Sequence, residues 1–328
     1  MMKKTKKMMR PKNDMKCSRL KQRRIGFLYA AVYLLPSLGL IVRADEAGDV
    51  AEQFELARQV IVSEADKEEK SSAFAELLKL ADSGHSDSAG ALGYCYLTGT
   101  GTDKDLVKAI DWYRKGAEGG SAKAQLNYAR YLMGTLDAKA FPLPDDAGKA
   151  NQQKQEGIKW LRKSAAQKLP EAAADLGYFL YSGRYGLDKD LAASEPWIRI
   201  AAEAGDIPSQ NILGVLYDRG FPDGEGGIVK DAREAELWYR EAAMCGDRKA
   251  QSNLGKLLDP FAKDRERRIE ALSWILLARS NKEPVAEKRM MEISPLLNQA
   301  ELQEAFVKSQ QLEVEVTKHL AARKQKTS

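Results

Sequence analysis

The sequence predicts an all-α protein built as a solenoid of stacked helical hairpins. Residues 88–120 contain two helix-like halves separated by glycines, and their pattern returns four more times downstream. All five tryptophans of the chain lie at the same place in successive copies. A single hairpin cannot bury its apolar face alone, so a pattern that returns at this period predicts copies packed against one another.

Residues 1–44 form a basic leader. They contain 12 Lys and Arg residues and one acid, Asp14, and residues 25–42 are largely apolar. Val42 and Ala44 place small side chains three positions and one position before Asp45, which is typical of a signal-peptidase site. The sequence therefore predicts a signal peptide, with an uncleaved membrane anchor over residues 25–42 as the alternative. Either interpretation predicts export, to a bacterial periplasm or out of the cell.

The remainder of the chain is mildly acidic. It contains 40 Lys and Arg residues against 46 Asp and Glu residues, a net charge of −6. Proteins that bind nucleic acids carry clustered positive charge, because contacts to phosphate dominate the affinity. We therefore expect no nucleic-acid partner, and membrane contact only if the leader stays uncleaved.

Residues 45–87 predict an irregular opening hairpin. Apolar residues recur at helical spacing over residues 49–63 and again over residues 67–82, and Gly84 follows the second run. Terminal repeats of a solenoid are commonly atypical, which fits this position.

Residues 88–284 predict five hairpins. Each first helix carries a large apolar anchor followed by a small residue, and each second helix carries one tryptophan. We expect these positions to form the repeat core: Leu92 and Gly93, Tyr128 and Ala129, Leu176 and Gly177, Leu213 and Gly214, Leu254 and Gly255, with Trp112, Trp160, Trp197, Trp238 and Trp274.

The glycine after the anchor has a physical explanation. Glycine costs a helix about 1 kcal/mol relative to alanine, so its return at one place predicts close approach of a neighbouring helix. Asp105, Asp190 and Asp231 stand seven residues before their tryptophans and suit helix N-caps. Gly120 and its equivalents Gly205 and Gly246 stand eight residues after them and suit left-handed helix ends.

Residues 285–328 depart from the pattern. We expect a short helix over residues 285–293, a break at Ser294 and Pro295, and a longer helix from Gln299 to about Arg323 that caps the last repeat. The residues after Arg323 are expected to fray.

Cys95 and Cys245 lie three repeats apart. Stacked helices advance about 9 Å per packing step, whereas a disulfide requires Cα atoms within about 7 Å. We therefore expect two buried thiols and no bridge between them.

The repeating unit resembles the Sel-one-like repeat, a relative of the tetratricopeptide repeat. The residues that carry the resemblance are Leu92, Gly93, Tyr96, Gly99, Gly101, Asp105, Lys108, Ala109, Trp112, Tyr113, Ala117 and Gly120, and the fourth unit matches again at Leu213, Gly214, Tyr217, Gly220, Asp231, Ala235, Trp238, Tyr239, Ala242, Ala243 and Gly246. The resemblance implies a right-handed α-solenoid and a role in binding or as an adaptor.

Catalytic motifs are scarce in the sequence. His85 and His319 are the only histidines and lie at opposite ends of the array, which argues against a His-centred triad or a His-rich metal site. The only Ser-x-x-Lys runs from Ser18 to Lys21, inside the leader. We expect no catalytic residue, no metal and no cofactor.

The candidate binding groove consists of first-helix residues that point away from the anchors. At about 100° per residue, the positions two and five after an anchor should face outward. In the first three repeats these are Tyr94, Leu97, Arg130, Met133, Tyr178 and Tyr181. Exposed Tyr, Met and Arg favour protein contacts; for Tyr178 and Tyr181, packing between repeats is the alternative.

These observations favour an exported, non-catalytic adaptor that binds a protein or peptide along the groove. The alternative, which rests on cysteine-rich members of the family, is a penicillin-interacting or cell-wall-related hydrolase. A third interpretation is a lumenal eukaryotic adaptor, although the chain contains no Asn-x-Ser/Thr sequon.

Overall fold

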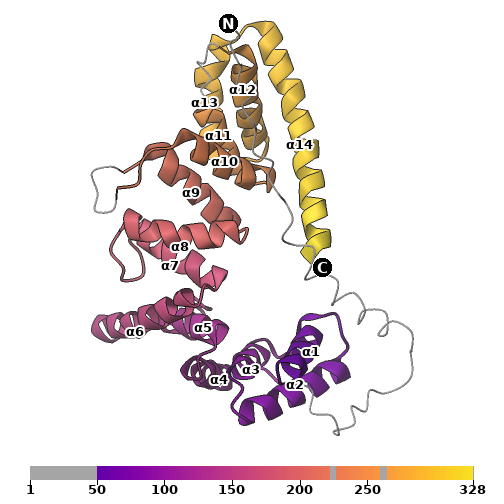
Figure 1. Cartoon of the computed structure of the whole chain (residues 1–328), viewed down its shortest axis with the longest axis vertical. Helices are drawn as coiled ribbons and strands as arrows, with labels where there is room; N and C mark the ends of the chain where they lie inside the picture. Colours follow the sequence, from indigo (N-terminus) through magenta and orange to yellow (C-terminus); the bar gives the residue numbers. More distant parts are fainter. Residues whose placement is uncertain (1–49, 222–226, 259–263, 328) are drawn as a thin grey trace, which may run out of the picture. The chain divides into compact units, whose positions relative to one another are not determined.

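The computed structural model describes residues 50–221, 227–258 and 264–327. These residues form α-helices, one 3-10 helix and no strand, which confirms the predicted all-α solenoid of stacked hairpins (Figure 1). The predicted leader lies outside the described residues. The helices are α1 (Val50–Val62), α2 (Lys67–Asp82), α3 (Ser86–Thr98), α4 (Leu106–Glu118), α5 (Ala122–Leu132), α6 (Ala147–Ala166), α7 (Pro170–Ser182), α8 (Leu191–Glu203), α9 (Ile207–Arg219), α10 (Ala232–Met244), α11 (Arg248–Leu257), α12 (Arg265–Ser280), α13 (Pro284–Ile293) and α14 (Gln299–Thr327).

Each second helix begins at an aspartate cap. The carboxylate of Asp105 accepts hydrogen bonds from the backbone N–H groups of Val107 and Lys108. Asp190 and Asp231 cap α8 and α10 in the same way. An N-cap carboxylate satisfies backbone N–H groups that have no partner within the helix, so these three predictions are confirmed.

Glycines end the second helices in the predicted left-handed conformation. Gly120, Gly205 and Gly246 have φ angles of 98°, 92° and 82°. Glycine adopts this region without the steric cost that other residues meet, so α4, α8 and α10 stop and the chain turns into the next hairpin. After α6 and α12, Lys168 and Lys282 take the same place, each with a φ angle of 61°.

Where a glycine follows the anchor, it permits close packing within its own hairpin. A methyl group added at Gly93 would lie 2.4 Å from the ring of Tyr113, and one added at Gly214 would lie 2.5 Å from the ring of Tyr239. Both distances are far shorter than a van der Waals contact. The predicted close approach of a neighbouring helix is therefore confirmed, and the neighbour is the residue that directly follows the tryptophan.

The tryptophans are less buried than expected. Trp274 is 2% exposed, but the other four indoles are only partly buried. The residue after each tryptophan is the one that enters the hairpin core, and these residues are Tyr113, Leu161, Ile198, Tyr239 and Ile275. Consecutive helix positions differ by about 100° in direction, so the indole lies at the edge of the hairpin core instead.

Because the partly buried indoles lie at the edge of the core, polar side chains can contact their rings. The ammonium groups of Lys115 and Lys163 lie 4.1 Å from the ring centres of Trp112 and Trp160, a favourable cation–π arrangement. Trp274 is fully buried because Leu312 and Val316 of α14 belong to the same apolar cluster.

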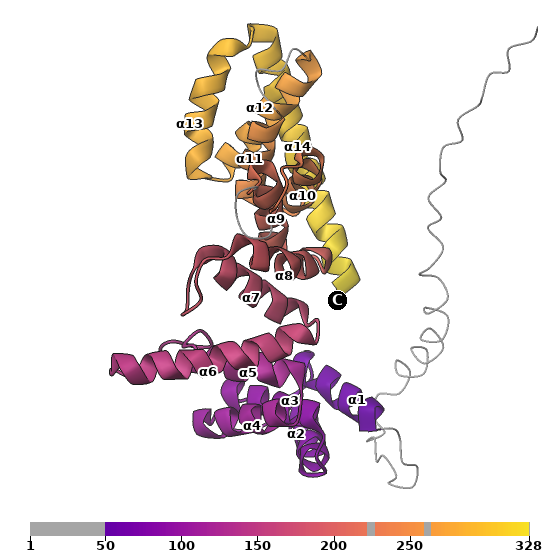
Figure 2. The same cartoon turned by 60° about the vertical axis from the view of Figure 1, so that its left-hand side comes forward.

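The C-terminal helices follow the predicted order. After α13, a 3-10 turn at Ser294–Leu296 leads into α14, which packs against α12 and α10 (Figures 1 and 2). Near the end of α14, Arg323 Nη2 donates to the carbonyl of Gly205 at 2.6 Å. The helix continues to Thr327 and not to about Arg323 as predicted, and α14 reaches further back than the last repeat.

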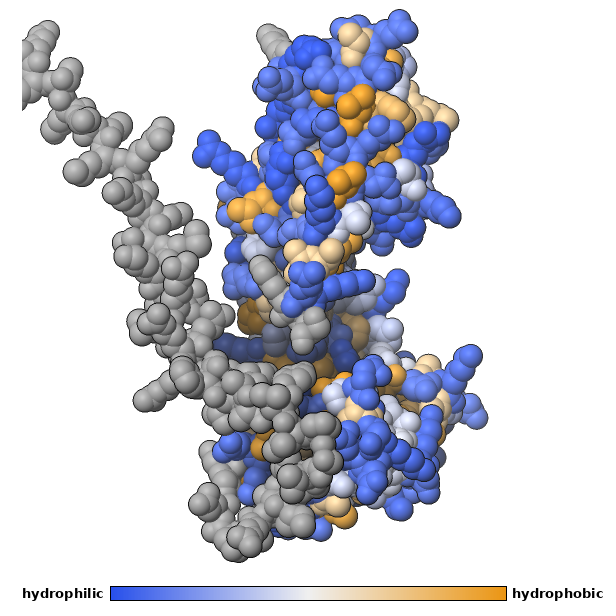
Figure 3. All heavy atoms as spheres, turned by 90° about the vertical axis from the view of Figure 1, so that its right-hand side faces the viewer, coloured by the Kyte–Doolittle hydropathy of each residue, from blue (hydrophilic) through white to orange (hydrophobic). Residues whose placement is uncertain are grey.

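The side of the molecule that carries α14 is mostly hydrophilic. Figure 3 shows small, separate groups of hydrophobic residues on this face, and the exposed side chains of α14 include Phe306, Val307 and Val314. Within the described helices, none combines the length and the apolar character needed to cross a bilayer.

Candidate functional site

The positions two residues after the anchors are accessible. Tyr94 on α3 is 43% exposed and Tyr178 on α7 is 38% exposed, while the side chain of Arg130 on α5 retains 33% of its exposure. The equivalent positions of α9 and α11 are the half-buried Val215 and the exposed Lys256. We call these five positions the first-helix face.

The positions five residues after the anchors do not belong to this face. Met133 is 1% exposed and packs into the core that α5 shares with α6 and α7, so its assignment to an open groove is wrong. Leu97 and Tyr181 are partly buried and pack towards the following hairpin. The next hairpin lies on this side of each first helix, so packing between repeats occupies positions that periodicity alone assigned to solvent.

An ion pair joins the first-helix face across two hairpins. Arg130 Nε on α5 donates to the carboxylate of Asp175 on α7 at 2.7 Å. Asp175 directly precedes the anchor Leu176, and the sequence analysis missed it. Asn127 and Asn253 are polar at the same place in two other first helices, and this recurrence was the sequence signal that could have indicated a polar contact here.

A neutral contact joins the first helices further along. Asn253 Nδ2 on α11 donates to Asn211 Oδ1 on α9 at 3.2 Å. On its other side, Asn253 Oδ1 accepts from both terminal nitrogens of Arg289 on α13 at 3.4 Å. We call Asn211, Asn253 and Arg289 the amide–arginine ladder; the sequence analysis missed it because α13 lies outside the repeat pattern.

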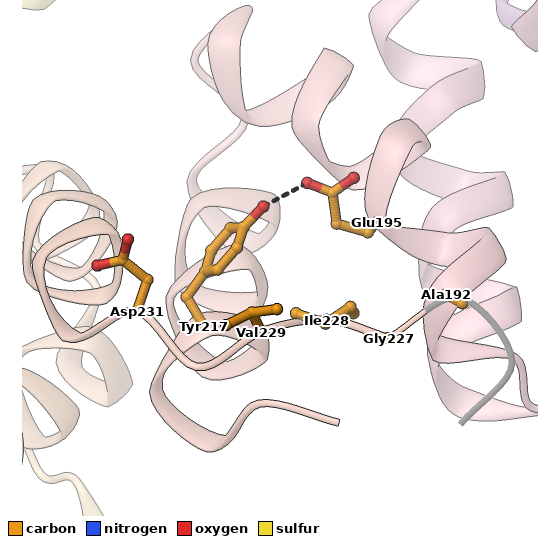
Figure 4. A pocket seen from close by; sticks show the side chains of 7 residues that line it. All are labelled: Ala192, Glu195, Tyr217, Gly227, Ile228, Val229 and Asp231. Carbon is orange, nitrogen blue, oxygen red and sulfur yellow. Dashed lines mark hydrogen bonds between the residues drawn. The ribbon is translucent and has the colours of Figure 1, made fainter. Parts of the chain in front are cut away.

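A shallow pocket lies between α8 and α9 (Figure 4). The hydroxyl of Tyr217 donates to Glu195 Oε1 at 2.7 Å, and Arg199 donates to the same carboxylate at 2.9 Å. Burial and the contact with the Glu195 carboxylate raise the pKa of the Tyr217 phenol. Both neighbours of this carboxylate donate to it, so the cluster ties two hairpins together and does not present a free base. The other lining residues are Ala192, Gly227, Ile228, Val229 and Asp231.

The two histidines lie in different parts of the chain and have different neighbours. His85 Nδ1 lies 2.7 Å from Ser88 Oγ at the start of α3, whereas His319 Nε2 on α14 lies 3.8 Å from Cys245 Sγ. In the described parts of the chain, no three His, Cys, Asp or Glu side chains gather as a metal site would require. The Ser18-to-Lys21 motif lies outside those parts.

Cys95 and Cys245 are buried free thiols. Burial among apolar residues raises the pKa of the Cys95 thiol to about 12. Cys245 follows the last residue of α10, where Arg323 Nη1 lies 2.7 Å from its sulfur.

A comparison with known protein families identifies four of the hairpins as Sel1 repeats. The profile of the Sel1 repeat matches residues 86–121, 122–169, 170–206 and 207–247, which correspond to the first four hairpins predicted from the sequence. The fifth hairpin, α11 and α12, lies outside this match. Helices α1, α2, α13 and α14 also lie outside it.

Two solved structures share the fold. A Sel1 repeat protein from Oxalobacter formigenes is 27% identical, with a TM-score of 0.52 over 73% of this chain and 91% of that chain. The protective antigen c5321 of uropathogenic Escherichia coli, which displays an SLR fold, is 23% identical, with a TM-score of 0.50 over 86% of this chain and 64% of that chain. The matched repeats, their hairpin packing and these two folds agree: the chain belongs to the Sel1 repeat family, whose repeats are typically protein–protein interaction modules.

Proposed function

We propose that the protein is an exported, non-catalytic adaptor that binds a protein or peptide along the first-helix face. The observation that carries this proposal is the exposure of Tyr94 and Tyr178 at the same place in two hairpins. Tyrosine offers a large, rigid contact area with a polar end and is enriched in protein interfaces. A partner that lies across consecutive first helices would meet both rings.

The chemistry of the side chains supports binding over catalysis. The Glu195 carboxylate accepts from both Tyr217 and Arg199, and the thiol of Cys95 is fully buried with a raised pKa. A general base must be free to accept a proton, and a nucleophile must be able to reach its substrate. Two donors already occupy the Glu195 carboxylate, and the Cys95 thiol is buried.

The proposed location is the bacterial envelope or the extracellular space. It is supported by the basic and apolar segments of residues 1–44 and by the small residues before Asp45. Sequencing the N-terminus of the protein recovered from an envelope fraction tests this point. A mature N-terminus near Asp45 supports cleavage, whereas an intact leader in the membrane fraction supports the anchor formed by residues 25–42.

Site-specific photo-crosslinking tests the binding face. A photoreactive phenylalanine analogue replaces Tyr94 or Tyr178 in the full chain, expressed in the source organism. We expect a discrete crosslinked protein at both positions. The same analogue at Val107 and Leu237, exposed residues of the second helices α4 and α10, serves as the matched control. Crosslinking that is equal at all four positions, or stronger at the controls, would overturn the proposal.

Labelled penicillin tests the alternative function. A non-catalytic adaptor should not become covalently labelled, because a hydrolase of this kind forms an acyl bond with its nucleophile. Stoichiometric labelling of the purified protein would favour the hydrolase.

A further inference from the structure

Arg289 on α13 is half-buried, and among the described residues no carboxylate lies at ion-pair distance from it. Its guanidinium donates to Ser252 Oγ at 2.6 Å, to the carbonyl of Ser252 and to Asn253 Oδ1. All of these acceptors are neutral. Burial lowers the pKa of the Arg289 guanidinium, and Tyr239 together with the more distant carboxylates of Glu283, Asp218 and Glu292 opposes this effect. Glu283 itself lies 3.5 Å from Arg248, so its charge is already shared.

Two other half-buried arginines, Arg240 and Arg199, are arranged differently. Arg240 on α10 lies 2.8 Å from Glu236 and 2.7 Å from Glu270, and Arg199 lies 2.9 Å from Glu195. A partly desolvated charge is costly unless an opposite charge compensates it. Arg289 therefore has only neutral hydrogen-bond partners, and its charge is balanced by carboxylates that lie further away, whereas Arg240 and Arg199 each contact a carboxylate directly.

Two exposed lysines extend this positive charge along the neighbouring helix. Lys249 and Lys256 lie four residues before and three residues after Asn253 on α11, which places all three on one side of the helix. Glu292 is the acid one turn after Arg289, and it lies 3.9 Å from Lys288. Arg289, Lys249 and Lys256 thus gather three positive charges around the ladder, against the more distant carboxylates of Asp218, Glu283 and Glu292, although the chain after the leader has a net charge of −6.

We propose that the amide–arginine ladder and its two flanking lysines bind an acidic segment of the partner protein. This inference rests on the proposed function and adds the chemistry of the partner. The planar guanidinium matches the geometry of a carboxylate, and the Asn211 and Asn253 amides can pair with a peptide backbone. Val285, one turn before Arg289 and 47% exposed, offers an apolar contact for a neighbouring side chain.

Binding of a labelled oligoglutamate peptide to the full chain, measured by fluorescence anisotropy, tests the inference. The probe controls are an oligoglutamine of equal length, an oligonucleotide and vesicles containing an anionic lipid. We expect the oligoglutamate to bind, more weakly as salt rises, and Arg289→Gln to lower its affinity about tenfold, the factor that corresponds to about 1.4 kcal/mol.

Matched variants distinguish binding at the ladder and its flanking lysines from a general effect of net charge. Lys256→Gln removes an exposed charge without disturbing packing and should lower the affinity a few-fold, which keeps the test valid if Arg289→Gln does not fold. Arg162→Gln removes one exposed charge from the second helix α6 and should leave the affinity unchanged. The basic residues of the leader are common to all variants, so differences among the variants report on this face.

Two outcomes would overturn the inference. One is equal oligoglutamate affinity in the wild type, Arg289→Gln and Lys256→Gln; the other is a preference for the oligonucleotide or the vesicles that depends on Arg289. Neither outcome concerns the proposed binding face in general. Crosslinks retained at Tyr94 and Tyr178 without an acidic preference would reject the partner chemistry and keep the adaptor function.

Discussion

The first helices of consecutive hairpins are joined by an ion pair in one half of the repeat array and by neutral amides in the other. Between α5 and α7, Arg130 meets Asp175 at 2.7 Å, and each charge satisfies the other. Between α9 and α11, Asn211 meets Asn253 at 3.2 Å, and Arg289 beside them has only neutral hydrogen-bond partners. The same packing of helices therefore produces a face whose charge is satisfied internally in one half and available to a partner in the other.

The core of the two halves is built in one way. The glycine after the anchor faces a tyrosine ring in both, Gly93 against Tyr113 and Gly214 against Tyr239. The difference between the halves is thus confined to polar residues at the surface. Repeat proteins stack near-identical units whose interfaces are similar along the array, so surface positions can vary without a change of fold.

The largest predicted effect tests whether the two cores are equivalent. Gly93→Ala and Gly214→Ala should each lower the free energy of unfolding by about 2 kcal/mol, because the added methyl group must displace a buried ring. This cost exceeds the gain in helix propensity, about 1 kcal/mol. Chemical denaturation followed by circular dichroism measures the effect.

A glycine in an open position provides the control. A methyl group at Gly148 in the first turn of α6 would approach only the carboxylate of Asp146, at 3.3 Å. Gly148→Ala should leave stability unchanged or raise it by up to about 1 kcal/mol. A Gly214→Ala variant as stable as the wild type, beside a destabilised Gly93→Ala, would show that the two cores differ.

The second prediction exchanges the polar character of the two halves. Asn253→Asp should place a carboxylate beside Arg289, compensate its charge and lower oligoglutamate affinity about tenfold. Asp175→Asn should free Arg130 and raise the affinity a few-fold, because the Arg130 side chain is 33% exposed and solvent screens an exposed charge. Fluorescence anisotropy of both variants at one ionic strength provides the comparison. Unchanged affinity in both would mean that pairing between first helices does not control the charge that a partner meets.

The sequence predicted the hairpins well because their signals are periodic and local. The aspartate caps, the left-handed glycines and the close packing at Gly93 follow from rules about single helices and their neighbours. The burial of the tryptophans was overestimated, because the spacing shows that Trp112 and Trp160 are equivalent but not which neighbour each indole meets. Tyr113, one residue later, is the side chain that the glycine accommodates.

The candidate site was predicted only in part. Periodicity correctly identified Tyr94 and Tyr178 as exposed, but it assigned Met133 to solvent because it contains no information about the following hairpin. Asp175 and Arg289 were missed for a different reason. Their roles depend on contacts with residues 45 and 36 positions away along the chain. The sequence pattern of a single repeat does not predict such contacts.

The smallest predicted effect concerns the buried thiol of the N-terminal half. Burial raises the pKa of Cys95 from 9.0 to about 12, so the folded state keeps its proton at a pH where the unfolded chain loses it. The stability from this proton is fully present below about pH 9 and falls as the pH rises towards 12. The stability cost of Cys95→Ala should therefore shrink by about 1 kcal/mol between pH 8 and pH 10, as measured by denaturation at each pH. Leu92→Ala creates a cavity in the same cluster without removing a titrating group, and its cost should not change with pH. If the cost of Cys95→Ala were equally constant, the thiol would be solvated in the folded state, and the N-terminal core would be more open than its packing indicates.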